Sequence, residues 1–251
     1  MRPVVTLLTD FGTADGYVAE VKGVILTRVP EAELVDVTHD IPPHDVEAGR
    51  LAVARYWRRF PAGTVHIAVV DPGVGSARGA LAVLSDGRHL VGPDNGLLSP
   101  ALLMGGARAV LLPVPAGAAP TFHARDVFAP AAALLAAGTP IDGLGPPAPD
   151  PEVRRTREPL RRDDGSIEGS VITVDRFGNA ITNLIAPHGG DVEVGTLRLR
   201  VLRTYADAAT GTPLALAGSN GLIEIAVRDG SAARALGLTR DARVVLWPAR
   251  R

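Results

Sequence analysis

The chain has 251 residues, which is enough for one large domain or two small ones at roughly 100–200 residues per domain. Hydrophobic residues make up 46% and charged residues 21%, so the sequence can form a buried core and is not typical of a disordered protein. The 26 basic and 27 acidic side chains give a formal net charge of −1, which argues against a protein that mainly binds nucleic-acid phosphates or an anionic membrane. The sequence contains no cysteine, which excludes disulfides, thiolate zinc sites, iron–sulfur clusters and a cysteine nucleophile.

No apolar stretch approaches the roughly 20 residues that a membrane-spanning helix needs. The N-terminal sequence MRPVVTLLTD lacks the long apolar stretch and the small-residue cleavage site of a secretory signal. We therefore expect a protein of the cytoplasm, with neither a membrane nor a nucleic acid as partner.

The first 150 residues alternate between short apolar runs, typical of buried strands, and stretches whose apolar residues recur at helical spacing. The expected strands are residues 4–9, 34–37, 65–70, 80–84, 90–91 and 110–114, and the expected helices are residues 17–29, 46–60 and 127–137. In the helix over 46–60, we expect Leu51, Ala54 and Trp57 to form one face. This alternation predicts an α/β domain with a mostly parallel sheet at residues 1–150.

Residues 141–165 differ from what precedes them, because they contain five prolines and five arginines and show no regular period. We interpret them as a partly exposed connector. Downstream, short strand-like runs are separated by turn signals at 170–174, 180–185, 192–194, 197–201, 214–216, 222–227 and 244–247, with a helical pattern only at 231–236. This pattern predicts a small all-β C-terminal domain at 166–251, an antiparallel sandwich or barrel.

Three aspartates come directly after predicted strands of the first domain: Asp10, Asp71 and Asp94. Ligands of open α/β sheets bind outside the carboxyl ends of the strands, so these side chains are expected to face one crevice. Each aspartate taken alone is also explained as an ordinary turn residue.

The segment VVDPGVGSAR at 69–78 is the most informative. Its proline and glycines impose a tight, irregular turn whose backbone can approach a ligand closely. Arg78 follows Asp71 by seven residues and is expected to fold back to meet it. The alternative is a surface loop with an incidental ion pair, which would contribute little to stability.

The segment FHARDVFAP at 122–130 places His123 and Asp126 immediately before a predicted helix. Asp126 is suited to the N-cap of that helix. His123 is suited to act as a general base, as an orienting residue or as a metal ligand, although a histidine at a helix start is more often structural.

Two segments of the C-terminal domain, VDRFGNAITN at 174–183 and GSNGLIEIAV at 218–227, place polar and aromatic residues around glycine turns between strands. They are either two ordinary hairpin turns or a set of loops that closes over a ligand. The residues concerned are Asp175, Phe177, Asn179, Ser219 and Glu224.

These four segments, together with TDFGTADGYV at 9–18 and GPDNGLLSP at 92–100, resemble the S-adenosyl-L-methionine hydroxide adenosyltransferases, relatives of the adenosyl-fluoride and adenosyl-chloride synthases. The resemblance runs in order over nearly the whole chain, and it is the combination of motifs that makes it specific. It does not extend to the connector at 141–165.

The resemblance implies an α/β N-terminal domain, a C-terminal antiparallel β-barrel, and a homotrimer whose sites lie between neighbouring subunits. It implies hydrolysis of S-adenosyl-L-methionine by in-line attack of water or hydroxide on carbon 5′, giving adenosine and L-methionine, with no metal and no cofactor. The implied catalytic residues are Asp71, Arg78 and His123, and which of Asp71 and His123 is the base stays open. The implied substrate-binding residues are Asp10, for the ribose hydroxyls, and Asp175, Phe177, Asn179, Ser219 and Glu224.

Three other functions stay open. A metal-dependent nucleotide hydrolase would use Asp71, His123, Asp126 and Asp94 to hold magnesium or manganese. A sensor would bind adenosine or S-adenosyl-L-methionine without turnover. Use of halide within the same family is disfavoured, because the family's halogenating members replace the segment that carries Asp71 and Arg78.

Overall fold

The computed structural model describes residues 2–186 and 188–249. It divides into two compact units, unit 1 at Met1–Arg155 and unit 2 at Thr156–Arg251. No helix within the described residues is long and apolar enough to cross a lipid bilayer.

The described residues of unit 1 form a six-stranded mixed sheet in the order β2-β1-β3-β5-β4-β6. Its strands are β1 (Val4–Thr9), β2 (Glu33–Thr38), β3 (Val65–Val69), β4 (Ala80–Ser85), β5 (Arg88–Pro93) and β6 (Arg108–Leu111). The pairs β1–β2, β1–β3 and β3–β5 are parallel, whereas β4 is antiparallel to both β5 and β6. The sheet is mixed because only two residues join β4 to β5, and so short a connection can link only antiparallel strands.

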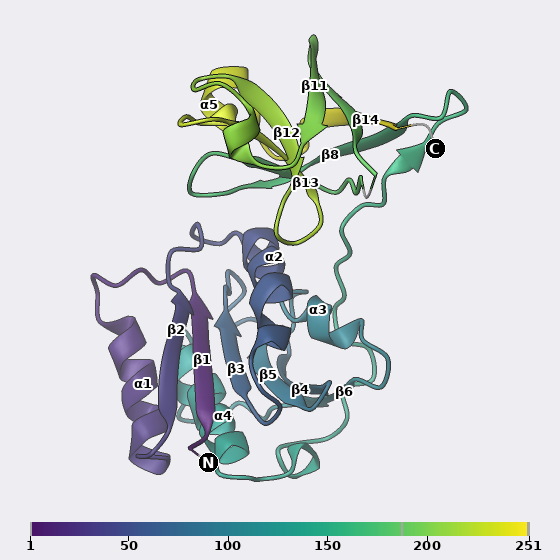
Figure 1. The fold of residues 1–251 in the computed structure, drawn as a ribbon. Helices are drawn as coiled ribbons and strands as arrows, with labels where there is room; N and C mark the ends of the chain where they lie inside the picture. The colour runs from purple at the N-terminus through teal and green to yellow at the C-terminus, as the bar shows by residue number, and fades with distance from the viewer. Residues whose placement is uncertain (1, 187, 250–251) are drawn as a thin grey trace. The chain divides into compact units, whose positions relative to one another are not determined.

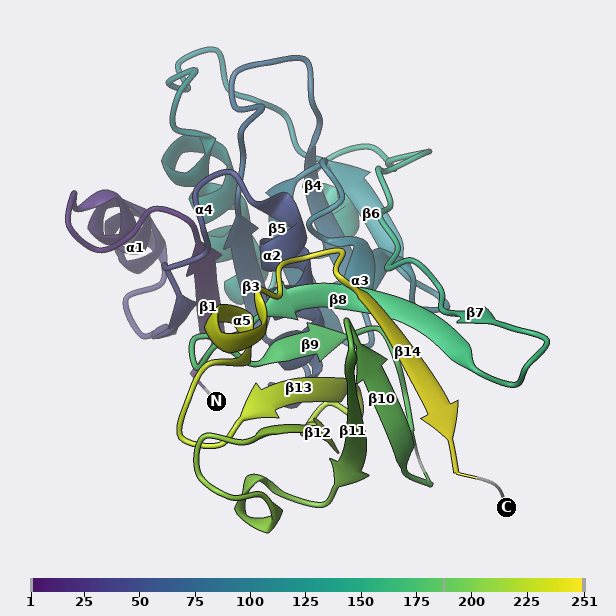
Figure 2. The same cartoon turned by 90° about the horizontal axis from the view of Figure 1, so that it is seen from above.

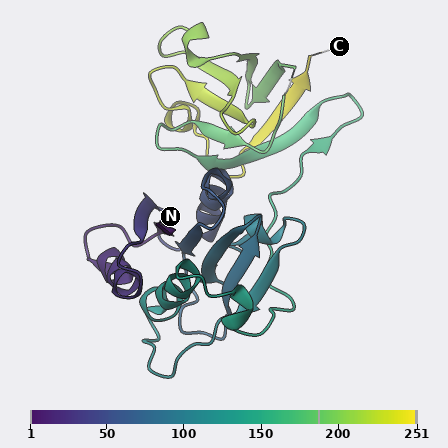
Figure 3. The same ribbon diagram turned by 60° about the horizontal axis from the view of Figure 1, so that its bottom comes forward.

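Helices cover both faces of this sheet (Figures 1 and 3). Helices α1 (Tyr17–Arg28) and α4 (Ala129–Ala136) pack on one face, where Leu7, Ile25 and Phe128 share a buried cluster. Helix α2 (Val46–Tyr56), the short 3₁₀ helix η1 (Trp57–Arg59) and helix α3 (Ser99–Leu102) cover the other, where Leu8 and Trp57 are buried together. Successive residues of β1 thus supply opposite cores, as the two-residue period of a strand requires.

The buried face of α2 differs from the expected one. Val46, Gly49, Arg50 and Val53 are buried and continue into Trp57, whereas Ala54 is exposed. The expectation of a face through Leu51, Ala54 and Trp57 is therefore wrong, because a strict three-residue spacing drifts around a helix of 3.6 residues per turn. The true face also includes a glycine, whose added Cβ would lie 2.8 Å from Cδ1 of Leu97.

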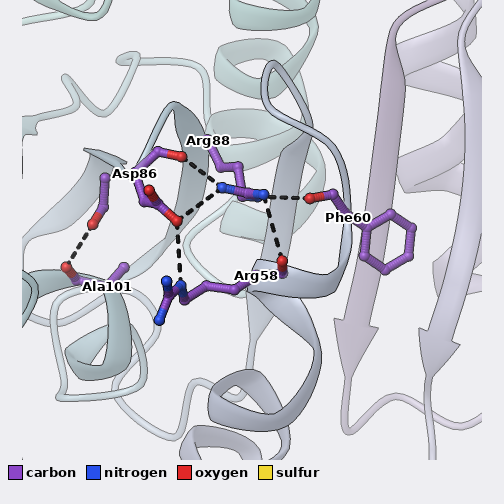
Figure 4. Close-up of polar contacts among 6 residues, drawn as sticks. Arg58, Phe60, Asp86, Arg88 and Ala101 are labelled. Atoms are coloured by element: carbon purple, nitrogen blue, oxygen red, sulfur yellow. Dashed lines mark hydrogen bonds and ion pairs between the residues drawn. The ribbon is translucent and has the colours of Figure 1, made fainter.

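The β4–β5 hairpin is held to η1 and to the residue after it by a polar cluster (Figure 4). Asp86 and Gly87 have φ values of 47° and 71°, as a type I′ turn requires. The Asp86 carboxylate contacts Nε of Arg58 at 3.2 Å and Nη1 of Arg88 at 3.0 Å, and Nε of Arg88 donates to the carbonyl of Phe60 at 2.7 Å. This cluster fixes the end of the sheet that lies opposite the carboxyl ends of β1 and β3.

The connector expected at 141–165 begins with the 3₁₀ helix η3 (Ile141–Gly143) and includes the two-residue strand β7 (Leu160–Arg161). Its first part is attached to unit 1: Ala148 N–H donates to the Ala109 carbonyl at 2.9 Å, and Arg154 N–H donates to Oγ of Ser99 at 2.8 Å. Residues that lack any hydrophobic period are thus ordered by backbone hydrogen bonds to the edge strand and to the start of α3.

In the described part of unit 2, seven strands close into a barrel in the order β14-β10-β11-β12-β13-β9-β8, with β8 paired back to β14 (Figure 2). The strands are β8 (Ile167–Val174), β9 (Ala180–Thr182), β10 (Gly190–Val194), β11 (Leu197–Leu202), β12 (Pro213–Ala217), β13 (Ile223–Val227) and β14 (Arg243–Pro248). The expected C-terminal barrel is confirmed. The pair β11–β12 is parallel, whereas the other neighbouring pairs of the barrel are antiparallel.

The parallel pair arises because the chain crosses between β11 and β12 through the 3₁₀ helix η4 (Tyr205–Asp207) instead of a tight turn. The barrel core contains Val171, Ile225 and Leu246, and the short helix α5 (Ala232–Leu236) contributes Ala232 to it.

Candidate active site

A pocket of about 510 Å³ in unit 1 lies beyond the carboxyl ends of β1 and β3. Asp10 follows β1 and Asp71 follows β3, and both line this pocket. Asp94 does not belong to the lining: its Oδ1 accepts the N–H of Glu152 at 2.7 Å, and burial raises the pKa of its carboxyl. Asp94, which was expected to face the same crevice as Asp10 and Asp71, is therefore hydrogen-bonded to the connector instead.

Arg78 folds back onto Asp71 and grips both oxygens of its carboxylate. Nε donates to Oδ1 at 3.0 Å and Nη2 donates to Oδ2, and the two side chains are only 10% and 6% exposed. Such a bidentate pair fixes geometry as well as charge. Nη2 also lies 3.0 Å from Nδ1 of His123, which lines the pocket, so Arg78 joins two residues 52 positions apart in the chain.

The contact with Arg78 defines the tautomer of His123. A guanidinium carries only donors, so Nδ1 of His123 must accept, and the hydrogen of the neutral imidazole is then on Nε2. Burial, followed by the positive charge of Arg78, lowers the pKa of His123. At neutral pH the ring is therefore uncharged, with an acceptor engaged by Arg78 and a donor at Nε2.

The guanidinium of Arg78 is held on its other sides as well. Nη1 donates to the Gly79 carbonyl at 3.0 Å, and the guanidinium carbon lies 5.4 Å from the ring centroid of Phe128. These contacts keep Arg78 in one orientation beside the pocket.

A π-helical turn, η2 (Ala124–Phe128), follows His123 directly and leads into α4. Such turns are uncommon and often occur at functional sites. The expectation that Asp126 is an N-cap is wrong, because the helical segment already starts at Ala124. The Asp126 carboxylate instead accepts the N–H of Ala119 at 2.8 Å and binds the guanidinium of Arg125, which lowers its pKa.

The loop that carries Asp71 and Arg78 approaches the loop before His123 at Gly75. This residue has φ +75°, and an added Cβ would lie 2.4 Å from the carbonyl oxygen of Pro120. A glycine is therefore required here both for its conformation and for the close contact that brings the two loops together.

Asp10 has a fixed and an available oxygen. Oδ2 accepts the N–H of His44 at 2.8 Å, whereas Oδ1 has no partner among the residues that the structure describes. His44 itself has φ +67° and lines the pocket. The sequence analysis missed His44, although it lies in the polar segment that follows the second strand.

The sequence analysis also missed an aromatic cluster on the pocket wall. Phe11, Tyr17 and Phe122 meet edge to face, with centroid distances of 5.3 to 6.2 Å. All three residues belong to the segments 9–18 and 122–130 that carry the family resemblance, and this was the signal that could have identified them. They give the pocket an apolar surface next to its carboxylates.

In unit 2, Asp175 organises the turn between β8 and β9. Its Oδ1 accepts the backbone N–H groups of Phe177 and Asn179, each at 2.9 Å, and its Oδ2 accepts Nδ2 of Asn179 at 3.0 Å. Phe177 is 77% exposed at the tip of this turn. Phe177 and Asn179 line a pocket of about 710 Å³ on unit 2.

Tyr205, which the sequence analysis missed, links this turn to Glu224. Its hydroxyl donates to Oε2 of Glu224 at 3.0 Å and lies 3.4 Å from Nδ2 of Asn179. Burial, together with the hydrogen bond to Glu224, raises the pKa of Tyr205 to about 12. Asp175, Asn179 and Glu224 are thus brought into one network, of which Asn179 and Tyr205 line the pocket. Ser219 is exposed and belongs neither to the network nor to the lining.

Within the described ranges, no group of three or more histidine, aspartate or glutamate side chains is arranged to hold a metal ion. The carboxylates that a metal-dependent hydrolase would use are engaged elsewhere. Arg78 binds Asp71, Arg125 binds Asp126, and the backbone of the connector binds Asp94.

Comparisons with known proteins agree over both units. The family described as SAM hydroxide adenosyltransferase N-terminal domain matches residues 5–145, and the corresponding C-terminal domain family matches residues 169–245. A protein of Thermus thermophilus named (R)-S-adenosyl-L-methionine hydrolase is 49% identical, over 95% of this chain and 96% of its own. A protein of Actinoplanes named fluorinase is 29% identical, over 90% and 91% of the two chains. The solved structure of an uncharacterised conserved protein from Thermotoga maritima superposes with a TM-score of 0.87 at 32% identity, covering 96% of this chain and 99% of the other. From the first strand to the last strand of the barrel, this chain belongs to the SAM hydroxide adenosyltransferase family.

Proposed function

We propose that this enzyme hydrolyses S-adenosyl-L-methionine to adenosine and L-methionine, with water as the nucleophile at carbon 5′. Relatives named (R)-S-adenosyl-L-methionine hydrolase are 40–49% identical over nearly the full chain. The observation that carries the proposed mechanism is the bidentate Arg78–Asp71 pair in contact with His123 at the pocket.

The substrate needs little help with its leaving group, because a sulfonium departs as a neutral thioether. The difficult part is the nucleophile, since bulk water has a pKa of ~15.7 and must acquire hydroxide character at one point. The site therefore has to supply a proton acceptor and a field that favours negative charge on oxygen. The oxygen must also stand about 3–3.5 Å from carbon 5′, in line with the sulfur.

The geometry supports Asp71 as the proton acceptor. The neutral ring of His123 can accept a proton only at Nδ1, and this atom already accepts a hydrogen bond from Arg78. Its Nε2 carries a hydrogen and therefore cannot accept a proton. The carboxylate of Asp71 keeps two of its four lone-pair sites after Arg78 has bound both oxygens. In this assignment Nε2–H of His123 orients the water, and Arg78 stabilises the charge that develops.

Asp10 is the proposed ligand of the ribose hydroxyls. Its position on the pocket wall and its unpaired Oδ1 support this role, because vicinal hydroxyls bind well to a carboxylate whose other oxygen is already fixed. Asp175, Phe177, Asn179, Ser219 and Glu224 are the proposed contacts of unit 2 with the nucleoside and methionine groups.

We further propose that the enzyme is a homotrimer in which the barrel of one subunit completes the site of its neighbour. The exposed ring of Phe177, which lines a surface pocket together with Asn179, supports this arrangement. Coexpression of an Asp71→Asn chain with an Asn179→Ala chain should restore activity that neither variant has alone. Absence of recovery together with a monomeric mass would contradict the trimer. The cytoplasmic location expected from the sequence stays a prediction.

The reaction is tested by incubating the protein with S-adenosyl-L-methionine, with and without a chelator and at several chloride concentrations, and by quantifying adenosine. We expect equal amounts of adenosine and methionine, unaffected by the chelator and by chloride. Activity restored by metal would favour the metal-dependent hydrolase, a chlorinated nucleoside would favour halide use, and binding without product would favour the sensor.

The three residues are tested by separate variants. Arg78→Ala and Asp71→Asn should each lower kcat at least a hundredfold while changing KM much less, since these groups act on the water. Arg108→Ala removes an exposed arginine that pairs with Asp142, so it is the matched control and should leave turnover unchanged. If Arg78→Ala keeps near-normal turnover, the assignment is wrong. A His123→Asn variant that is less impaired than Asp71→Asn would support Asp71 as the base.

A further inference from the structure

A chain of polar side chains runs from the surface of unit 1 to the end of β1. Nζ of Lys22 donates to Oδ2 of Asp36 at 2.6 Å, and Oδ1 of Asp36 lies 3.0 Å from Nε2 of His39. Nδ1 of His39 in turn lies 2.8 Å from Oγ1 of Thr9. Thr9 is 2% and His39 is 6% exposed, and none of these four residues lines the pocket.

The hydroxyl of Thr9 connects His39 to the backbone of the loop after β1. Nε2 of His39 faces the carboxylate of Asp36, which offers only lone pairs, so this nitrogen carries a hydrogen. Oγ1 of Thr9 lies within hydrogen-bond distance of Nδ1 of His39, and it also accepts the N–H of Phe11 at 3.2 Å.

The same two residues also join the loop after β1 to the loop after β2 through their backbones. Gly12 N–H donates to the carbonyl of His39 at 2.8 Å, and Ile41 N–H donates to the carbonyl of Thr9 at 3.4 Å. Asp10 lies between these tie points and receives the N–H of His44 from the second loop. The side-chain contact between Thr9 and His39 thus adds a buried link to the backbone hydrogen bonds that join the two loops.

We propose that Thr9 and His39 are positioning residues, which hold the loop at residues 10–12 so that the Asp10 carboxylate meets the ribose hydroxyls of the substrate. This inference rests on the proposed role of Asp10. Thr9 and His39 act through the backbone of Phe11 and Gly12 and do not touch the substrate.

The chain provides a matched control on the same strand. Oγ1 of Thr6 lies 2.7 Å from Nδ1 of His66, and both residues are completely buried. This pair repeats the threonine–histidine contact three residues earlier along β1, outside the lining of the pocket. Removing the hydroxyl of Thr6 thus costs a comparable buried hydrogen bond without affecting the loop that contains Asp10.

The test compares adenosine with 2′,3′-dideoxyadenosine, which lacks both hydroxyls, by calorimetry on the full chain. Thr9→Val should weaken adenosine binding about threefold to tenfold, as expected for one lost hydrogen bond, and leave dideoxyadenosine binding unchanged. Thr9→Ser should retain the preference for adenosine. Thr6→Val should lower the thermal stability and leave binding of both nucleosides as in the wild type.

Two further variants complete the test. His39→Leu should reproduce the effect of Thr9→Val, and the double variant should lose no more than either single one, because both remove the same link. Asp10→Ala tests the underlying assignment and should abolish the preference for adenosine.

The outcomes separate the two proposals. If Asp10→Ala abolishes the preference while Thr9→Val and His39→Leu both preserve it, the positioning role is wrong and the role of Asp10 stands. If Asp10→Ala preserves the preference, both are wrong. If Thr9→Val does not fold, His39→Leu alone decides the first comparison.

Discussion

Acid should destabilise unit 1 through His66, the second residue of β3. This histidine is completely buried, with the rings of Tyr56 and Phe60 at centroid distances of 5.4 and 5.6 Å. Burial, followed by the charge of Arg88, lowers the pKa of His66 to about 4. In the unfolded chain an exposed histidine titrates near its ordinary pKa of about 6.5.

The sign follows from the number of bound protons. Between the two pKa values the unfolded chain binds a proton that the folded chain does not, so the free energy of unfolding falls as the pH falls. At about 1.36 kcal/mol per pKa unit, the difference between the two pKa values corresponds to roughly 3 kcal/mol. About 2–3 kcal/mol should be lost between pH 7.5 and 4.5, which is a large fraction of the usual stability of a domain.

The assay is urea unfolding of the wild type and His66→Gln at both pH values. Glutamine does not titrate and keeps an acceptor for the hydroxyl of Thr6, so the variant should lose about 2–3 kcal/mol less than the wild type on acidification. His188→Gln, which removes an exposed imidazole, should behave as the wild type. Equal acid sensitivity of wild type and His66→Gln would refute the reasoning.

Three more substitutions follow from contacts described above. Gly75→Ala should lower kcat at least tenfold, because its Cβ would meet the carbonyl of Pro120 and push apart the loops that carry the proposed catalytic residues Asp71 and His123. Gly106→Ala, with φ +79° and open space around it, should show only the backbone strain and unchanged turnover. Tyr205→Phe should raise KM for S-adenosyl-L-methionine about threefold and leave kcat unchanged, because its hydroxyl joins Asn179 and Glu224, two of the proposed substrate contacts. A lower kcat at equal KM would contradict that proposal. Asp86→Ala should cost about 1–2 kcal/mol in urea unfolding with normal activity, because it removes the carboxylate that two arginines share and the residue suited to the type I′ turn; unchanged stability would contradict this role of the cluster in Figure 4.

Much of the fold followed from local signals in the sequence. Short, continuous apolar runs such as residues 65–69 are typical of buried strands. Strands that alternate with helices come first along the chain and strands without intervening long helices follow, which separates an α/β unit from an all-β unit. The antiparallel placement of β4 was also encoded locally, since Asp86-Gly87 is a hairpin signal that the alternation of strands and helices obscured. The buried face of α2 was harder to predict, because it includes Gly49 and Arg50, which do not contribute to an apolar pattern.

The contacts of the candidate site likewise include some that local sequence predicts and others that it does not. Asp71 and Arg78 are close in the chain and separated by turn residues, so their pairing could be expected. The contact of Arg78 with His123 depends on a π-helical turn and on the close approach at Gly75, neither of which has a sequence period. Asp94 has the same local signal as Asp71, yet the connector binds it. Contacts between segments far apart in the chain decide which of several similar residues reaches a site.

The pairing of charges around the pocket has a consequence for the reaction cycle. Glu20 is bound by Arg125 and Asp71 by Arg78, which leaves Asp10 as the one carboxylate without an arginine among the described residues of the lining. S-adenosyl-L-methionine carries a net positive charge at neutral pH, so coulombic attraction favours its entry at low ionic strength. Cleavage converts the sulfonium into an uncharged thioether and leaves neutral adenosine. Breaking the carbon–sulfur bond therefore also removes the coulombic contribution to binding, so neither product is attracted to the pocket in this way.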